Sequence, residues 1–346
     1  MTPGRMNHLQ KIAFLAWATV MVLVFAGSFV RATGAGLGCP DWPTCYGQLI
    51  PPTSVDQIDF DSLPLEKFKA KVLQAGGNPD LVTAESLREN FNARATWTEY
   101  INRLLATPVA LVGLLLLVIS FASREEFGKA PFLSSVFGMF LILVNAVIGA
   151  LVVRSSLDSS TITLHMALTM LLLCVNIYTA WTASANRWTL TFSNHRGKLV
   201  FLGWVLFSLT IAEGIMGSQV RELTDEMAKS HIGEARELWA EELEQTGIYL
   251  AHRSFSWLIF FVALGFGWVA RRDLQNGLGL LEKWIVGIVV AQMLLGVTMS
   301  FIAVYAPVQI AHVFLSALLV SVEFLWLLGT WRQRPVEAFG AESLAV

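Results

Sequence analysis

The chain contains a series of charge-free apolar runs, each about 20 residues long, and this length limits its fold more than any other feature. A helix needs about 20 apolar residues to cross a hydrocarbon core of roughly 30 Å, because backbone polar groups find no water there. The residues are 55% hydrophobic and 14% charged, which is outside the range of ordinary soluble domains. The sequence therefore predicts an all-α integral membrane protein.

Eight transmembrane helices are expected from these runs. Five are charge-free runs at 12–30, 104–123, 130–153, 161–186 and 254–270, and a sixth, at 199–220, is interrupted only by Glu213. Two more lie in the uncharged stretch 284–322, where Pro307 breaks any single helix.

The positions of the charges predict an orientation. Short segments rich in lysine and arginine, such as the one with Arg271 and Arg272, flank one side of the spans. By the positive-inside rule that side is cytoplasmic, so both termini are expected inside a cell inner (plasma) membrane. The long segments 31–99 and 221–249 are then external loops. Membrane lipid is the expected surrounding, and no basic cluster indicates a nucleic-acid partner.

The sequence also repeats itself. Three patterns recur with matched spacing, namely GSFVR at 27–31 and GSQVR at 217–221, Asn102-Arg103 and His252-Arg253, and an amide-x3-Gly run before each of His165 and His312. Four spans per half is an even number, so both halves enter the membrane in the same direction. We therefore expect two repeat-related four-helix bundles, residues 1–190 and residues 191–346.

Three of the six histidines lie near the external start of a predicted span, and they are His165, His252 and His312. An imidazole is costly in lipid unless it has a partner, and haem fits between the facing helices of a bundle with imidazoles on its iron. His252 and His312 are predicted to bind haem iron in the second half, and His165 in the first. Polar interface anchors and a copper or zinc site are the alternatives, but no further metal ligands at suitable spacing support the latter.

The first half lacks one of these histidines, since Asn102 occupies the position that matches His252. A haem there would be five-coordinate or take another sixth ligand. Glu99 lies three residues before Asn102, on the same helical face, and is a candidate proton acceptor beside a cofactor. The alternative for Glu99 is a carboxylate that complements the helix dipole.

The first external loop contains Cys39 and Cys45, on the side of the membrane where a disulfide is permitted. Their spacing does not match covalent haem attachment. A structural disulfide and a redox-active pair both remain open.

Two further groups of charged residues call for partners. Four arginines occupy repeat-matched positions at the outer boundary, namely Arg31, Arg103, Arg221 and Arg253. They are predicted to bind haem propionates, and the alternative is that they anchor the helices at the membrane interface. Glu213 and Glu323 lie within predicted spans, where a carboxylate is either functional or placed in a polar pocket between helices.

The residues resemble a known family. The run 27–45, GSFVRATGAGLGCPDWPTC, is similar to the first external loop of haem A synthases. Glu99-Tyr100-x-Asn102-Arg103, Leu164-His165, His252-Arg253 and Ala311-His312 follow in that family's order. Asn102 departs from the family's usual pattern, which places His at this position.

The resemblance implies an eight-helix enzyme that converts haem O, its substrate, to haem A, its product, for cytochrome oxidase. The first half would oxidise a ring methyl group to a formyl group with oxygen from water, with Glu99, Asn102 and His165 as catalytic residues. The second half would hold a haem b through His252 and His312. A haem O synthase, terminal oxidase assembly factors and an unidentified electron acceptor are the expected partners.

The alternative function is a non-enzymatic dihaem electron-transfer protein or haem carrier built on the same two bundles. Glu99 and the loop with Cys39 and Cys45 favour the enzyme, because a plain electron-transfer bundle does not require them. A transporter is less consistent with the spans, which lack paired Gly/Pro-broken helices at the midplane.

Overall fold

The computed structural model describes residues 6–74, 78–155, 159–184, 189–190, 196–230, 240–273, 279–302 and 305–331. Within these ranges the chain consists of helices, turns and loops, and its one extended pairing is an isolated bridge between Cys45 and Gln48. The all-α class predicted from the apolar runs is confirmed.

Among the described residues, eight helices are long and apolar enough to span a membrane. They are α1 (His8–Ala32), α4 (Ala93–Ala122), α6 (Lys129–Arg154), α7 (Ser159–Thr182), α8 (Arg196–Ser230), α10 (Gly247–Asp273), α11 (Leu280–Phe301) and α12 (Ala306–Gly329). The predicted break at Pro307 is also present, because this proline lies in the first turn of α12, where it removes no helical hydrogen bond.

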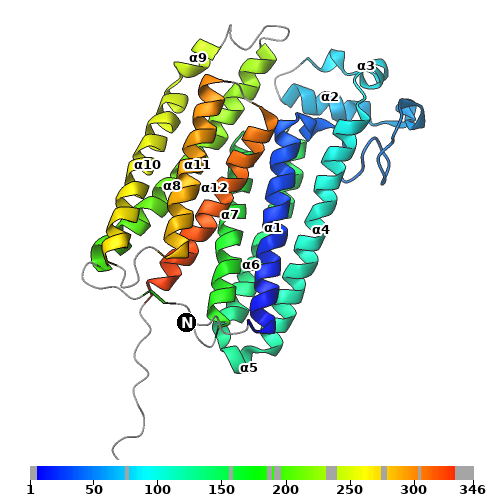
Figure 1. The fold of residues 1–346 in the computed structure, drawn as a ribbon. Helices are drawn as coiled ribbons and strands as arrows, with labels where there is room; N and C mark the ends of the chain where they lie inside the picture. The colour runs from blue at the N-terminus through cyan, green and yellow to red at the C-terminus, as the bar shows by residue number, and fades with distance from the viewer. Residues whose placement is uncertain are drawn as a thin grey trace, which may run out of the picture.

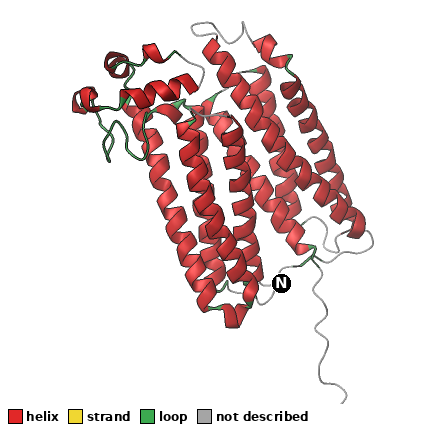
Figure 2. Ribbon diagram, turned by 180° about the vertical axis from the view of Figure 1, so that it is seen from behind, coloured by secondary structure: helices red, strands yellow, loops and turns green. Residues whose placement is uncertain are grey.

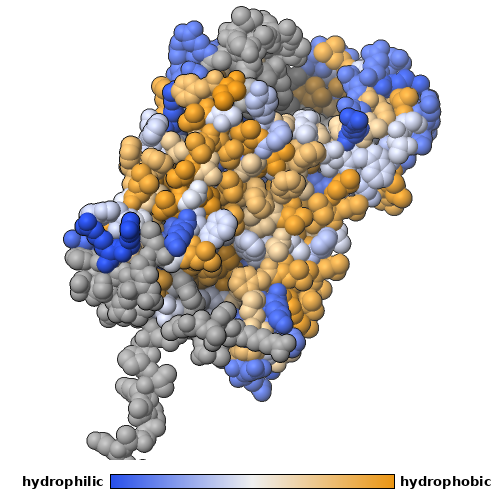
Figure 3. Space-filling model, viewed as in Figure 1, coloured by the Kyte–Doolittle hydropathy of each residue, from blue (hydrophilic) through white to orange (hydrophobic). Residues whose placement is uncertain are grey.

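The helices present apolar side chains outward over most of their length. Figure 3 shows a broad hydrophobic surface in the middle of the molecule and hydrophilic residues towards both ends. Large side chains such as Leu111, Phe140, Phe261 and Leu294 each expose more than half of their surface. Such a belt is unfavourable in water and favourable in lipid, so the chain is a multi-pass membrane protein.

The eight helices pack as two neighbouring sets (Figures 1 and 2). In one set α1 and α6 each contact α4 and α7, and in the other α10 and α12 each contact α8 and α11. The sets meet where α12 contacts α1 and α7, and where α7 contacts α8. Across this boundary Trp17 donates to Ser321 (3.0 Å) and Thr163 to Ser218 (3.2 Å). The repeat relation between the sets, and a division at residue 190, remain predictions.

The segment between α1 and α4 forms a cap at one end of the bundle, described for residues 33–74 and 78–92. It contains the helices α2 (Leu65–Gln74) and α3 (Ala84–Glu89) and the 3-10 turns η1 (Ala35–Leu37), η2 (Val55–Gln57), η3 (Phe60–Ser62) and η4 (Pro79–Leu81). The cap has its own small core of Cys39, Cys45, Tyr46, Ile58, Phe60, Leu63, Phe68 and Val82. It lies at the same end as α9 (Ala240–Glu244) and opposite α5 (Arg124–Phe127) and the N-terminus (Figure 1).

Two helices continue beyond the apolar runs. α4 begins at Ala93, so Glu99, Asn102 and Arg103 are helical, and Asn92 caps it by accepting from the Ala95 N–H. α8 runs to Ser230, so the expected external loop 221–249 starts as helix. Hydropathy marks only the part of a helix that crosses lipid, whereas hydrogen bonding carries the helix into water.

The second set of helices contains two almost fully buried carboxylates, each with a neutral donor. Trp326 Nε1 donates to Glu282 Oε1 at 2.7 Å, and Thr210 Oγ1 donates to Glu323 Oε1 at 3.0 Å. Glu323 thus lies in a polar contact between α8 and α12 rather than in lipid.

A close approach at Gly203 sets the spacing of these two helices. A Cβ at this position would overlap the Trp326 ring, which is buried and packed edge-on against Phe266. Gly203→Ala should therefore lower the stability of the protein in detergent by about 1–3 kcal/mol, the usual cost of overpacking. The measurement is thermal unfolding by circular dichroism.

Gly287→Ala is the matched control, because a Cβ on Gly287 in α11 meets nothing within 4 Å. This variant should melt at or slightly above the wild-type temperature, since alanine favours a helix over glycine. Equal melting temperatures of the two variants would contradict the proposed packing of Gly203 on Trp326.

Candidate functional site

The three predicted ligand histidines all lie near the cap end of the bundle, in the first two turns of α7, α10 and α12. The Nδ1 atoms of His165, His252 and His312 are buried and make no aligned hydrogen bond with the described part of the chain. A buried imidazole without partners is unfavourable. This pattern fits side chains that bind a cofactor, as expected for haem.

In the second set of helices His252 and His312 lie near enough to interact electrostatically. His252 lies against α8, where Gly217 leaves room for its ring, since a Cβ there would come within 3.2 Å of Cε1. Gln292 donates to the backbone carbonyl of His312 at 2.9 Å. His252 thus packs against α8, and the backbone of His312 is bonded to α11, while the bis-histidine site itself remains a prediction.

In the first set Asn102 takes the corresponding place. A Cβ on Gly27 would lie 3.9 Å from Asn102 Oδ1, and one on Gly149 would lie 3.5 Å from His165 Cε1. The Oδ1 atom of Asn102 is also buried and unpartnered. The glycine of the repeated GS-x-VR pattern therefore faces Asn102 in one set and His252 in the other.

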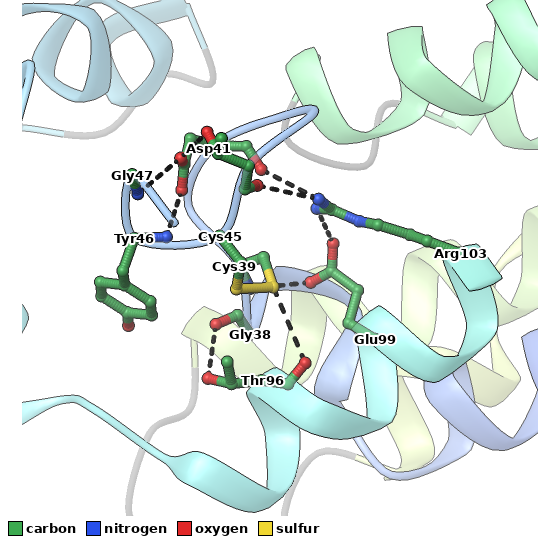
Figure 4. The surroundings of a disulfide bond; sticks show 10 residues. Gly38, Cys39, Asp41, Cys45, Tyr46, Gly47, Thr96, Glu99 and Arg103 are labelled. Carbon is green, nitrogen blue, oxygen red and sulfur yellow. Dashed lines mark hydrogen bonds and ion pairs between the residues drawn. A yellow bond between two sulfur atoms is a disulfide. The ribbon is translucent and has the colours of Figure 1, made fainter. Parts of the chain in front are cut away.

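Cys39 and Cys45 form a disulfide, so the pairing predicted for the first external loop is present (Figure 4). The loop that they close lies directly on the first turns of α4. A Cβ on Gly38 would overlap the backbone of Ala95 and Thr96, and Thr96 donates to the Gly38 carbonyl at 2.8 Å. Only glycine permits this approach of loop to helix.

Glu99 and Arg103 fasten the disulfide loop to α4 (Figure 4). The Cys39 N–H donates to Glu99 Oε2 at 2.9 Å, and Arg103 forms an ion pair with Glu99 Oε1. Arg103 also donates to the carbonyls of Asp41 and Thr44, each at 3.1 Å. The predicted proton acceptor is therefore buried, paired with a cation and bonded to the backbone of a disulfide cysteine.

Asp41 shapes the loop itself. It accepts from the backbone N–H groups of Tyr46 (2.7 Å) and Gly47 (2.9 Å) and from the Thr44 hydroxyl. Burial, followed by the negative charges of Asp41 and Glu99, raises the pKa of the Tyr46 phenol above its ordinary value. Tyr46 is therefore a neutral hydroxyl beside the disulfide at physiological pH.

The four predicted propionate partners lie at the cap end, but in different surroundings. Arg103 is engaged by Glu99, and the Arg253 guanidinium lies 5.2 Å from the centre of the Phe301 ring. Arg221 donates to the Arg31 carbonyl at 3.4 Å and so links α8 to α1. Their contact with propionates remains a prediction.

The contact between Glu213 and His252 was not predicted from sequence. Glu213 Oε1 on α8 lies 3.1 Å from His252 Nδ1 on α10, and Ser256 donates to the same oxygen. The available signal was the spacing of Glu213 and Gly217, which places both on one face of α8. The residues next to Glu213 in the sequence do not indicate that His252 lies opposite it.

Most of the chain is similar to a known protein family. A family model described as cytochrome oxidase assembly protein matches residues 10–324, a range that contains every predicted site residue. A curated relative, the Heme A synthase of Shewanella oneidensis, is 29% identical over 160 residues. That similarity covers 44% of this chain and 40% of the relative, so the chain spans less than half the length of that curated protein.

The geometry around the disulfide gives a test of the loop's attachment. Arg103→Leu removes three polar contacts and should cost about 1–3 kcal/mol of local stability, so the loop should open at least about fivefold more often. The measurement is the rate of maleimide labelling of Cys39 and Cys45 under mild reductant, in a Cys174→Ala background.

Arg253→Leu is the control, because Arg253 occupies the matched position of the second half and lies over Phe301, away from the loop. Its labelling rate should equal that of the parent protein. A similar rate in both arginine variants would show that Arg103 does not attach the loop.

Proposed function

The chain belongs to the cytochrome oxidase assembly protein family, and from that premise we propose that it is a haem A synthase. The observation that carries the proposal is the family match over residues 10–324, which includes the disulfide loop, Glu99 and all three ligand histidines. The similarity to the Heme A synthase of Shewanella oneidensis supports the same substrate class.

The proposed reaction oxidises a ring methyl group of haem O to a formyl group. In balanced form, one methyl group and one water give one formyl group, four protons and four electrons. The water supplies the oxygen, and the electrons pass to an acceptor outside the bundle. The protein must therefore bind the porphyrin, admit water and accept protons.

In the proposed substrate site His165 and Asn102 are the residues that face haem O from α7 and α4. Gly149 and Gly27 give each of them room. An imidazole on one side and an amide on the other would hold the substrate's iron asymmetrically, since an amide is a poor iron ligand. The face towards Asn102 is then the more open one.

Glu99 is the proposed proton acceptor. It lies one turn before Asn102 and Arg103 on α4 and is 3% exposed, at the boundary between the cap and the bundle. Its ion pair with Arg103 fixes the position of the carboxylate at this boundary. The same residue fixes Cys39, so the disulfide loop and the proton acceptor are positioned together.

In the second half His252 and His312 are the proposed ligands of a haem b. When bound, this group supplies one-electron transfer between the substrate site and the external acceptor. Positive charge for the propionates comes from three arginines at the cap end, Arg31, Arg221 and Arg253. Arg103 contributes through guanidinium N–H groups that do not bind Glu99.

The proposed setting is the inner (plasma) membrane with both termini in the cytoplasm. The basic residues Arg124 in α5 and Arg271 and Arg272 at the end of α10 lie at the end opposite the disulfide-containing cap, which supports an external cap (Figure 1). A haem O synthase and terminal oxidase assembly factors are the proposed partners within the membrane.

The second candidate is a non-enzymatic dihaem electron-transfer protein or haem carrier. The three buried Nδ1 atoms without an aligned hydrogen bond in the described chain favour haem binding but do not themselves require catalysis. Glu99 separates the two functions, because electron transfer does not need a proton acceptor at this place.

Glu99→Gln is the direct test of the catalytic role. Glutamine keeps an oxygen that accepts from the Cys39 N–H but is not a base, so haem A formation should fall at least about a hundredfold. The measurement is haem A formed by cells that co-express a haem O source, with haem content of the purified variant determined in parallel.

Glu282→Gln is the control, since Glu282 is buried on α11 beside Trp326, away from the cap. It should retain haem A formation. Wild-type activity in Glu99→Gln would remove the catalytic assignment, and disulfide labelling at the wild-type rate in that variant distinguishes a catalytic loss from a loosened loop.

A further inference from the structure

The imidazole of His252 lies on the face of α8 that carries Glu213 and Gly217. Its Nδ1 atom is 3.1 Å from Glu213 Oε1, although the N–H is not aligned with that oxygen. One helical turn further along, the missing side chain of Gly217 leaves space for ring atom Cε1. The position of the ring is therefore determined by two residues of α8.

Glu213 is an unusual residue to find at this place. It lies within a membrane-spanning helix, and its side chain is 16% exposed. Ser256 donates to Oε1, whereas Oε2 is buried without a hydrogen-bond partner in the described chain. Burying a carboxylate with so few donors is costly, so stability of the bundle alone does not explain it.

The internal duplication offers a comparison within one molecule. The spacing that matches Gly27 to Gly217 places Leu23 opposite Glu213, and the spacing that matches Asn102 to His252 places Ala106 opposite Ser256. The glycine is therefore the same in both halves, while the acid, the imidazole and the hydroxyl occur together in one half only. The carboxylate is therefore present only in the half that has the histidine, and it is not part of the helix framework that both halves share.

We propose that Glu213 is a positioning residue for His252, whose carboxylate orients the imidazole towards haem iron and lowers the reduction potential of that haem. The inference rests on the proposed function, because it concerns the haem b site of the second half. It deepens that function by giving the two halves different redox properties.

The chemistry follows from the two nitrogens of the ring. A carboxylate that accepts from Nδ1–H fixes the tautomer in which the Nε2 lone pair is free for a metal, and it makes the imidazole a stronger donor. Because Nδ1 already lies 3.1 Å from Glu213 Oε1, reorienting the His252 ring would align the N–H with that oxygen without moving either helix. Both the stronger donor and the nearby negative charge favour the oxidised, more positive iron, so both lower the potential.

The test is a spectroelectrochemical titration of purified protein containing haem b. In Glu213→Gln we expect haem to be retained and the ratio of reduced to oxidised haem at fixed potential to rise at least tenfold, a shift of about 59 mV for one electron. Glu213→Asp should lie between wild type and Glu213→Gln. The low-spin electron paramagnetic resonance signal should shift with the potential.

Glu323→Gln is the matched control, because Glu323 is a buried carboxylate of the same half that pairs with Thr210. It should titrate as wild type does. A Glu213→Gln variant with the wild-type potential and signal would overturn the inference. If the wild-type second half bound no haem, so that His252→Ala released none, the proposed function would fail instead.

Loss of haem from Glu213→Gln is also interpretable. The apo-proteins are then titrated with haem b after circular dichroism has shown equal helix content. A haem affinity at least tenfold below that of Glu323→Gln supports the positioning role. Equal affinities of the two variants contradict it.

Discussion

In the hydrocarbon core a backbone N–H or carbonyl finds no water, so each must be satisfied within its own helix. That constraint produces the eight spanning helices and leaves side chains as the means of placing chemistry. Polar side chains inside the membrane then need partners of their own, which the chain supplies for Glu282 through Trp326 and for Glu323 through Thr210. The Nδ1 atoms of His165 and His312 make no aligned hydrogen bond with the described residues, and these histidines are proposed as ligand positions.

The two sets of helices use similar positions for different chemistry. Gly27 and Gly217 each open a space beside the facing helix, which Asn102 occupies in one set and His252 in the other. Around Asn102 the chain adds a disulfide loop fastened by Glu99 and Arg103, whereas around His252 it adds Glu213. A substrate site with a proton acceptor and a haem site with a tuned ligand are the proposed consequences of this asymmetry.

Much of the fold was predictable because lipid selects for length and hydropathy. The eight spans, the break at Pro307 and the pairing of Cys39 with Cys45 were all expected from sequence. The unbroken continuation of α8 from its apolar run to Ser230 was not, since hydropathy does not show where a spanning helix continues beyond the membrane. The contacts of Glu99 with Cys39 and of Glu213 with His252 join residues far apart in sequence. Their partners depend on how helices pack, which a single sequence does not specify.

The central claim is that haem O enters this protein and leaves as haem A. The most direct test is pyridine haemochrome analysis, with chromatography, of haems extracted from the purified protein after co-expression with a source of haem O. The proposed function predicts haem A, or a hydroxylated haem O intermediate, beside haem b. Extraction of haem b alone, despite a supply of haem O, would contradict it and favour a dihaem electron-transfer protein.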